Sequence, residues 1–415
     1  MSYLGYLRCL RCGTKVAAGA GYGGCPDCAA AGVNVNALPA YDLSGVDDLI
    51  PVDRSQRGIF RYRRLLPLSG GDPVVSLGEG GTPLLPVPRL GAALGVPRLY
   101  LKDETRNPTW SYKDRLAAVA ISRAVADGAE TVVVATTGNH GAAVAAYAAA
   151  AGLRCVVLTL ESVPQTMKTL MQVYGAEVVA LRAAPERWQL MAEAVRERGW
   201  VPMSGYRNPP VGSNPFGVDG YKTIAYELVE QLGTAPDVVV VPTAYADGLA
   251  GIGRGFDDLR ELGVIGRAPR LVAAESFGPY SDALASGAEL GGPVPAGPTV
   301  AFSIGSPFGT YQGLAALRGS DGVGVAVPDD SEILDHQALV GRTEGLYLEN
   351  ASVVAVAAAG KLAHAGQLGP QETVVVIGSS TGLKDVGATA ARLPAVPVIA
   401  PDLASLDAAL GTVTR

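Results

Sequence analysis

A strand pattern passes directly into a helix pattern at residues 99–127, which read LYLKDETRNPTWSYKDRLAAVAISRAVAD. Residues 99–102 form a short run typical of a buried strand, and from Asp114 onward apolar residues recur at helical spacing. A polar loop joins the two, and we expect the helix to begin near Ser111. A strand that leads through a loop into a helix is the repeating unit of an α/β fold.

The same alternation runs through the chain from about Val74. Short β-branched runs predict strands at 99–102, 131–135, 154–159, 177–180, 238–241, 271–275, 324–327 and 373–377. Alanine-rich amphipathic stretches predict helices at 114–127, 141–151, 167–174, 185–197 and 220–232. This order indicates an α/β fold whose parallel sheets are covered by helices on both faces. Ligands of such folds bind beyond the carboxyl ends of the strands, so we expect the chemistry in the loops after Lys102, Ala135, Val241 and Ile377.

The composition limits the size and class of the protein. Its 415 residues exceed what one hydrophobic core usually serves, and at about 100–200 residues per domain we expect two or three domains. Apolar residues make up 48% of the chain, which is enough to bury a large core. The net charge of −6 provides no basic surface for a nucleic acid.

The sequence contains no pattern of a secretory signal or a membrane span. Its first residues, MSYLGYLRCLRC, lack the apolar core of a signal peptide. The longest small-apolar stretch, residues 142–160, is interrupted by Gly152 and Arg154, whereas a span needs about 20 strongly apolar residues. We therefore expect a soluble, cytoplasmic protein that binds neither membranes nor nucleic acids.

Four of the five cysteines form two CxxC pairs, Cys9 with Cys12 and Cys25 with Cys28. Each pair places two thiolates at one tight turn, and two pairs supply the four ligands of a tetrahedral zinc site. We expect a zinc-ribbon-like module at residues 1–45 that holds structural zinc with no open position for a substrate. The alternatives are a ribbon that folds without metal and an oxidised pair of cysteines.

The loop after residues 99–102 brings Lys113 into the first turn of the predicted helix. The positive end of the helix dipole lowers the pKa of an amine at this place. A neutral lysine can attack an aldehyde and hold it as a Schiff base. The alternative is a solvated surface lysine, which is the commoner role for a lysine in a first turn.

The loops after the next two predicted ligand-side strands contain groups that suit anions. TTGNHG at 136–141 opens an alanine-rich helix, and its hydroxyls, amide and free N–H groups suit a carboxylate. An ordinary helix cap formed by Asn139 or Thr137 is the alternative. PTAYADG at 242–248 leads small residues into a helix, which suits a phosphate. The absence of GK[ST] from that loop argues against a nucleoside triphosphate.

The loop after the last predicted strand, GSSTGLKD at 378–385, matches the GxSxG pattern of a hydrolase nucleophile. That fold places its histidine after the serine in the chain, but the last histidine here is His364. We therefore set the hydrolase interpretation aside.

Taken in order, these segments resemble the fold-type II pyridoxal-phosphate enzymes (the tryptophan synthase β-like family), and within them the threonine synthase-like branch. The resemblance runs from about Leu77 to Asp385, and double CxxC segments also occur in some members of the branch. The matching stretches are LGEGGTPLL, LYLKDETRNPTWSYKDR, TTGNHGAAVAAYAA, MQVYGAEVV, NPFGVDGYKTIAYEL and GSSTGLKD. The resemblance implies two three-layer, parallel-sheet domains and a homodimer. It assigns residues 46–110 and 216–415 to the large cofactor-binding domain and residues 111–215 to the smaller one.

The resemblance also implies roles for individual residues. Lys113 is similar to the lysine that binds pyridoxal phosphate covalently and moves the Cα proton. Asn139 resembles the asparagine that bonds the ring hydroxyl, and Ser379 occupies the position of the hydroxyl that meets the pyridine nitrogen. The cofactor phosphate is expected at Thr243, Ala244, Tyr245, Ala246, Asp247 and Gly248. The substrate is expected at Ser111, Thr136, Thr137 and Gly138.

The serine at position 379 has a consequence for the chemistry. A hydroxyl stabilises a protonated pyridine less than a carboxylate does, so the cofactor is a weaker electron sink. This favours elimination or replacement at Cβ, with Lys113 as acid and base. A γ-replacement of the threonine synthase kind stays open.

Three stretches depart from the family pattern. Trp110 stands where a small residue, usually glycine, precedes the Ser-Tyr-Lys stretch, which would reshape the pocket beside Lys113. The phosphate loop is poor in glycine and carries an acid, Asp247. LENAS at 348–352 replaces the more usual Glu-Pro-Ala-Ser. These departures favour a specialised relative of threonine synthase.

Several further residues are open to two interpretations. Arg115 and Lys222 either meet an anionic leaving group or are charges on helix surfaces. His140 either touches the substrate or has a packing or capping role. Cys155 falls in a predicted buried strand and is expected to be part of the core.

The principal prediction is a pyridoxal-phosphate-dependent carbon–oxygen lyase or synthase that acts at Cβ or Cγ of an amino acid. Threonine formation from O-phosphohomoserine is its first candidate reaction. Replacement on O-phosphoserine, as in the related cysteate synthases, and dehydration of serine or threonine are alternatives. The non-enzymatic alternative is a zinc-anchored binding module that has lost its chemistry, against which Lys113, Asn139 and Ser379 argue.

Overall fold

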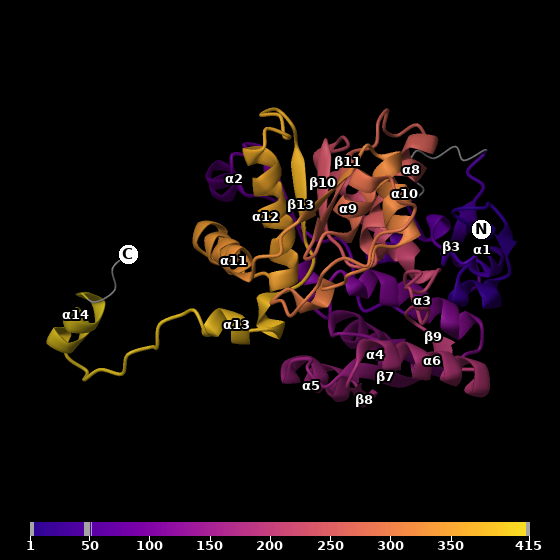
Figure 1. Cartoon of the computed structure of the whole chain (residues 1–415), viewed down its shortest axis with the longest axis horizontal. Coiled ribbons are helices and arrows are strands. Elements are labelled where there is room, and N and C mark those ends of the chain that lie inside the picture. The colour runs from indigo at the N-terminus through magenta and orange to yellow at the C-terminus, as the bar shows by residue number, and fades with distance from the viewer. Residues whose placement is uncertain (1–3, 45–49, 51, 412–415) are drawn as a thin grey trace.

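The computed structural model describes residues 4–44, 50 and 52–411, which form three sheets with helices packed around them (Figure 1). The largest sheet has six strands, the second has four and the N-terminal sheet has three. In Figure 1 the four-stranded sheet lies below the large one, and the N-terminal module lies beside them at the right.

The large sheet has the strand order β12-β11-β10-β13-β5-β4. All neighbouring strands are parallel except the edge pair of β4 and β5. The strands are β4 (Leu84–Pro86), β5 (Leu99–Asp103), β10 (Val238–Pro242), β11 (Arg270–Glu275), β12 (Val323–Ala326) and β13 (Val374–Gly378).

Successive residues of the central strands face two different cores. Val238 and Val240 of β10 pack in the core that includes α12 (Asn350–His364). Val239 and Val241 pack in the core that includes α7 (Lys222–Leu232) and α8 (Asp247–Glu261). Because neighbouring side chains of a strand point to opposite faces, an all-valine run requires cover on both sides. The helices on the two faces provide it.

The four-stranded sheet has the order β8-β7-β6-β9, and its neighbouring strands are all parallel. One face packs with α3 (Lys113–Ala126) and α4 (Asn139–Ala151), and the other packs against Met191 of α6 (Ala184–Arg198). Cys155 lies on the α3–α4 side and is 5% exposed, so the prediction that it belongs to the core is confirmed. The strands are β6 (Thr131–Ala135), β7 (Arg154–Leu160), β8 (Glu177–Leu181) and β9 (Val201–Pro202).

The N-terminal module is a small antiparallel sheet that carries the cysteines. The sheet consists of β1 (Leu4–Cys9), β2 (Lys15–Val16) and β3 (Ala37–Tyr41). The short helix α1 (Pro26–Ala30) lies between β2 and β3 in the chain. Phe216 from the body of the protein packs in the core of this module. The remaining α-helices are α2 (Pro88–Leu94), α5 (Gln165–Val173), α9 (Pro279–Ser286), α10 (Tyr311–Gly319), α11 (Asp330–Glu344), α13 (Gly387–Ala390) and α14 (Leu403–Gly411).

The predicted α/β fold class is confirmed, and the predicted strands and helices agree with the structure to within two residues at each end. The helix expected near Ser111 begins at Lys113, because Ser111 forms an isolated β-bridge with Ser380. The short edge strands β4 and β9 were not predicted. The limits of the two domains stay a prediction.

No helix among the described residues combines the length and the apolar composition that crossing a bilayer needs.

The last described residues leave the body of the protein. The Arg392 guanidinium pairs with Asp335 at 2.8 Å, and beyond it the chain runs out to α14, away from both large sheets (Figure 1). No residue of 393–411 is buried.

A chain that ends at Arg392 is therefore expected to be as stable as the full chain, within about 0.5 kcal/mol, since no residue of 393–411 is buried. Urea unfolding of the two proteins, followed by circular dichroism, measures the difference. A loss of more than about 1 kcal/mol would mean that the segment packs on the protein or on a second copy in solution.

Candidate active site

Three of the four loops that the sequence indicated are joined by hydrogen bonds at the carboxyl ends of the strands. The Tyr112 N–H, just before α3, donates to the Ser379 carbonyl after β13 over 2.9 Å. The Ser380 hydroxyl donates to the Trp110 carbonyl over 3.2 Å and to Asn139 Oδ1 over 3.1 Å. The start of α3, the start of α4 and the end of β13 therefore meet at one place.

The fourth loop, residues 243–248, reaches the same place through Gly248. A side chain at Gly248 would put its Cβ 2.7 Å from the Tyr112 ring. Glycine is thus the residue that allows this close approach between α8 and the start of α3. The fourth loop and the other three surround the first turn of α3.

Lys113 is the first residue of α3, and its side chain is partly buried. Among the described residues its amine has no hydrogen-bond acceptor and no ion-pair partner. It lies 5.1 Å and 5.7 Å from the ring centroids of Tyr112 and Tyr221. Burial lowers the pKa of the amine, while the carboxylates of Asp247 and Glu349 act in the opposite direction. An amine of this kind can act as a nucleophile or a base.

Asn139 is the centre of a buried polar cluster. Its Nδ2 donates to Glu349 Oε2 over 2.6 Å, and its Oδ1 accepts from the Lys384 amine over 2.7 Å. Glu349 also accepts a hydrogen bond from Ser303 over 2.6 Å. Burial lowers the pKa of Lys384 to about 8, against the opposing effect of Glu349. The site therefore holds a second amine whose pKa is lowered, besides Lys113.

The side chain of Ser379 bonds only another hydroxyl among the described residues. Its Oγ lies 2.8 Å from Ser352 Oγ, and either atom can be the donor. Ser352 also accepts from the Ser380 N–H over 2.9 Å. Ser379 can thus present a hydroxyl to a ligand while Ser352 holds it in orientation.

In the loop after β6, some of the polar groups predicted to bind an anion instead form the hydrogen bonds that begin α4. The Thr136 hydroxyl accepts from the N–H groups of Gly138 and Gly141, both over 3.0 Å. Gly138 has a φ of 150°, and Thr137 makes no hydrogen bond with a described residue. The expected capping role therefore belongs to Thr136. The N–H and the carbonyl of Gly138 are both engaged within the start of α4, whereas Thr137 keeps free groups.

In the loop after β10 most polar groups are bonded within the protein, and only a few backbone N–H groups are left for a ligand. Thr243 donates its N–H to Ala274 O and its hydroxyl to Val241 O, so it extends the sheet. Tyr280 donates to the Ala244 carbonyl, and Asp247 Oδ1 accepts from the Ser213 N–H and from Gln312. The first N–H groups of α8, at Asp247 and Gly248, have no carbonyl within the helix to meet, and they are the donors left for an anion.

His140 contributes an unsatisfied nitrogen. Its Nε2 is buried without a hydrogen-bond partner among the described residues. Burial holds the pKa of His140 well below its usual range, and the nearby Lys113 acts in the same direction. A neutral imidazole is therefore available at this end of α4.

A family described as pyridoxal-phosphate dependent enzyme matches residues 75–380. The chain belongs to this family. It is a pyridoxal-phosphate-dependent carbon–oxygen lyase, as the sequence predicted.

Curated relatives of the chain are threonine synthases. That of Methanocaldococcus jannaschii is 33% identical over 83% of this chain and 86% of its own length. That of Methanosarcina acetivorans is 33% identical over 92% of each chain. The predicted resemblance to the threonine synthase-like branch is thereby confirmed.

Solved structures share the fold at lower identity. An O-ureido-L-serine-bound mutant of O-ureido-L-serine synthase has a TM-score of 0.64 and 23% identity over 84% of this chain and all of its own. Maize serine racemase has a TM-score of 0.61 and 21% identity, covering 72% of this chain and 88% of its own.

The residues present fit the cofactor of this family. Lys113 has an amine without a partner among the described residues, and Asp247 at the start of α8 acts on its pKa. The same amine acts on the pKa of His140, whose buried Nε2 also lacks a hydrogen-bond partner among the described residues. Sequence reasoning missed the buried carboxylate and amine that hold Asn139, namely Glu349 and Lys384. Both lie in stretches that the sequence had already marked, LENAS and GSSTGLKD.

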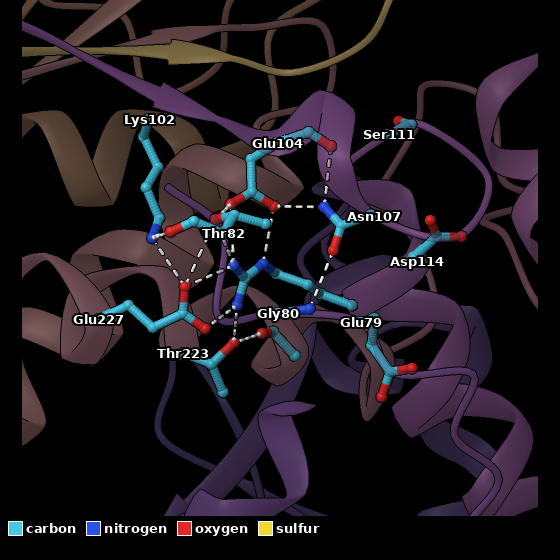
Figure 2. A network of polar contacts seen from close by, with 12 residues as sticks. Glu79, Gly80, Thr82, Lys102, Glu104, Asn107, Ser111, Asp114, Thr223 and Glu227 are labelled. Atoms are coloured by element: carbon cyan, nitrogen blue, oxygen red, sulfur yellow. Dashed lines mark hydrogen bonds and ion pairs between the residues drawn. The ribbon is translucent and has the colours of Figure 1, made fainter. Parts of the chain in front are cut away.

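A buried ionic network fixes the start of α3 (Figure 2). Arg115 is fully buried and bonds both Glu104 oxygens and both Glu227 oxygens, each over 2.8 Å. Lys102 of β5 donates to the same Glu227 over 2.7 Å. Burial alone would raise the pKa of Glu227, but Arg115 and Lys102 together hold it below its usual range.

Arg115 and Lys222 were each expected either to meet an anionic leaving group or to be a charge on a helix surface, and the structure shows neither role. Arg115 is neutralised by Glu104 and Glu227 and is no surface charge. Lys222 is also fully buried and pairs with Asp258 at 2.6 Å. Their helices are buried on several sides, which the spacing of charges in the sequence does not reveal.

The four N-terminal cysteines converge as the sequence predicted. Their sulfur atoms all lie within 4.8 Å of one another, and Cys9–Cys28 and Cys12–Cys25 are 3.6 Å apart. A disulfide requires about 2.05 Å, and all four cysteines are free. A tetrahedral site with Zn–S bonds of about 2.3 Å separates its sulfurs by about 3.8 Å. The arrangement suits zinc, whose presence stays a prediction.

We expect one zinc ion per chain, and we expect Cys9→Ser to lose the metal and to melt at a lower temperature. Metal analysis and thermal unfolding measure the two effects. Cys155→Ala is the control, since this cysteine lies in β7 and its change should leave the zinc content intact. A purified protein without zinc, or an unaltered melting point for Cys9→Ser, would contradict the site.

We expect Glu227→Gln to lower the free energy of unfolding by about 3–5 kcal/mol, because it leaves Lys102 and part of Arg115 as uncompensated buried charges. Glu230→Gln on the same helix is the control. Glu230 pairs with Arg61 at the surface, and its loss should cost about 0–1 kcal/mol. Urea unfolding of both variants measures the difference. If both lose the same free energy of unfolding, the buried network stabilises the protein no more than a surface ion pair does.

Proposed function

We propose that this enzyme eliminates or replaces a substituent at Cβ or Cγ of an amino acid, with threonine formation from O-phosphohomoserine as the first candidate. One observation carries the proposal. Among the described residues the amine of Lys113 is unpaired, and it is close enough to Asp247 at the start of α8 and to Glu349, which holds Asn139, for both carboxylates to act on its pKa. The relatives named threonine synthase support the first candidate.

The proposed residues for the cofactor follow from these positions. Lys113 would bind it covalently, Asn139 would meet the ring hydroxyl, and Ser379 would meet the pyridine nitrogen. Its phosphate would lie at residues 243–248. Since Thr243 and the Asp247 carboxylate are engaged within the protein, the backbone N–H groups of Asp247 and Gly248 are the favoured donors.

Bound pyridoxal phosphate supplies an electron sink for the bonds at Cα. A hydroxyl at Ser379, held by another hydroxyl, favours a moderate sink and hence departure of a β- or γ-substituent. The lowered pKa of Lys113 supports its role as the base that takes the Cα proton and as the acid that returns it. Thr137 would hold the substrate carboxylate, with Ser111, Thr136 and Gly138 shaping that loop.

Two other reactions use the same groups. Replacement on O-phosphoserine and dehydration of serine or threonine both begin with loss of the Cα proton. Incubation with O-phosphohomoserine, O-phosphoserine and threonine separates them through release of phosphate or of a 2-oxoacid. Phosphate and threonine from O-phosphohomoserine would support the first candidate, and a 2-oxoacid from threonine would replace it with dehydration. The homodimer also stays a proposal, which light scattering would test.

Borohydride reduction of the cofactor-loaded enzyme is expected to fix the pyridoxyl group on Lys113, because this amine has no partner whereas Lys384 is held by Asn139. Peptide mapping identifies the labelled lysine. Lys113→Ala should lose the label and the visible absorption of the bound cofactor, and Lys384→Met, the control, should keep the label. A pyridoxyl group on Lys384, or on neither lysine, would contradict the proposal.

A further inference from the structure

Among the described residues, one buried arginine lacks a carboxylate partner. Two arginines are fully buried among the described residues, Arg115 and Arg187, at 0% and 5% exposure. Arg115 is bound by two glutamates, whereas Arg187 forms no ion pair with any described residue. Buried arginines are normally paired, because an isolated charge loses its hydration without compensation.

Two backbone carbonyls hold Arg187 in place. Its Nη1 donates to the Thr136 carbonyl over 2.7 Å, and its Nε donates to the Ala184 carbonyl over 3.4 Å. The remaining nitrogen, Nη2, donates to none of the described residues. Burial lowers the pKa of Arg187, and Tyr245 acts in the opposite direction. The carbonyls fix the guanidinium but leave its charge uncompensated.

Arg187 lies where the two halves of the proposed site meet. Thr136 belongs to the loop proposed for the substrate carboxylate, at the end of β6. The next residue on α6, Trp188, packs its ring edge-on against Tyr245 with centroids 6.3 Å apart. Tyr245 belongs to the loop proposed for the cofactor phosphate, after β10. The guanidinium therefore binds the Thr136 loop directly, and this turn of α6 lies beside the Tyr245 loop.

We propose that Arg187 binds an anionic group carried on the side chain of the substrate, beyond Cβ. This inference rests on the proposed function and names the charge that its substrate must carry. A phosphate ester or a distal carboxylate fits a planar guanidinium, which can donate two parallel hydrogen bonds to either. The ligand supplies the counter-charge that the protein lacks at this point.

The proposal predicts a preference between substrates. Amino acids with an anionic side chain, such as O-phosphohomoserine and O-phosphoserine, should bind better than serine and threonine. Aspartate and glutamate, as inhibitors, separate the two sources of the anion. Strong binding of the phosphorylated compounds alone would assign the site to phosphate, and equal binding of the dicarboxylates would assign it to carboxylate.

The test compares Arg187→Gln with Arg196→Gln in the cofactor-loaded enzyme. Arg196 lies on the same helix but is exposed and pairs with its neighbour Glu197, so its change should have no effect. Loss of one charge-assisted contact should raise the KM for the phosphorylated substrate, or the Kd of a dicarboxylate inhibitor, by about 10- to 100-fold. The KM for serine or threonine should stay within about 2-fold, since these side chains carry no charge for Arg187 to meet.

Arg187→Lys keeps a charge without the planar fork and should give an intermediate increase. It also preserves the test if Arg187→Gln does not fold. Calorimetric titration of the loaded enzyme with inorganic phosphate provides a readout independent of turnover, and Arg187→Gln should weaken that binding by a similar factor.

Failure of this inference is distinguishable from failure of the proposed function. If Arg187→Gln and Arg187→Lys retain the pyridoxyl label on Lys113 and bind anionic substrates as the unaltered enzyme does, the role of Arg187 is overturned and the proposed function stands. If KM rises equally for charged and uncharged substrates, Arg187 is only structural and the inference is again overturned. Absence of the label from Lys113 in the unaltered enzyme would instead remove the proposed function.

Discussion

The active site depends on how the first turn of α3 is held. The helix packs on the four-stranded sheet, yet its start is bound to the large sheet at two points. Tyr112 donates to Ser379 at the end of β13, and Arg115 bonds Glu104, which directly follows β5. Lys113 lies between these two anchors in the sequence. One helix thus connects the two sheets, and its only unpaired amine faces the point where their loops meet.

The buried cations of this protein differ in how completely they are neutralised. Arg115 and Lys102 share two glutamates, and Lys222 has Asp258. Lys384 donates to an amide that is itself bound to Glu349. Lys113 and Arg187 have no carboxylate of their own among the described residues. Because an unpaired buried charge is unfavourable, such positions persist where a ligand supplies what the protein omits. Both of these side chains adjoin the loops that carry the candidate site.

The sequence predicted the architecture well because its signals are local. The valine run of β10 and the alanine-rich helices fix each element within a few residues, and the rule for parallel sheets indicates which loops meet. Contacts between distant elements leave no such signal. The pairing of Lys102 with Glu227 joins residues 125 positions apart. Arg187 resembles the other arginines of an amphipathic helix in sequence, and only the packing of α6 on the sheet distinguishes it from exposed Arg196.

Trp110 illustrates a local preference that the tertiary structure overrides. Its φ of 58° lies in the left-handed region, which costs a residue with a side chain roughly 1–2 kcal/mol. The backbone is held there because the Trp110 carbonyl accepts from Ser380 and from the Thr381 N–H. Glycine, the residue that the family pattern predicts here, would adopt this conformation without strain. The tryptophan ring is 46% exposed, so core packing does not offset the cost. The strained backbone of Trp110 is therefore held by Ser380, which also bonds Asn139. The strain is maintained by hydrogen bonds of the candidate site and not by packing in the core.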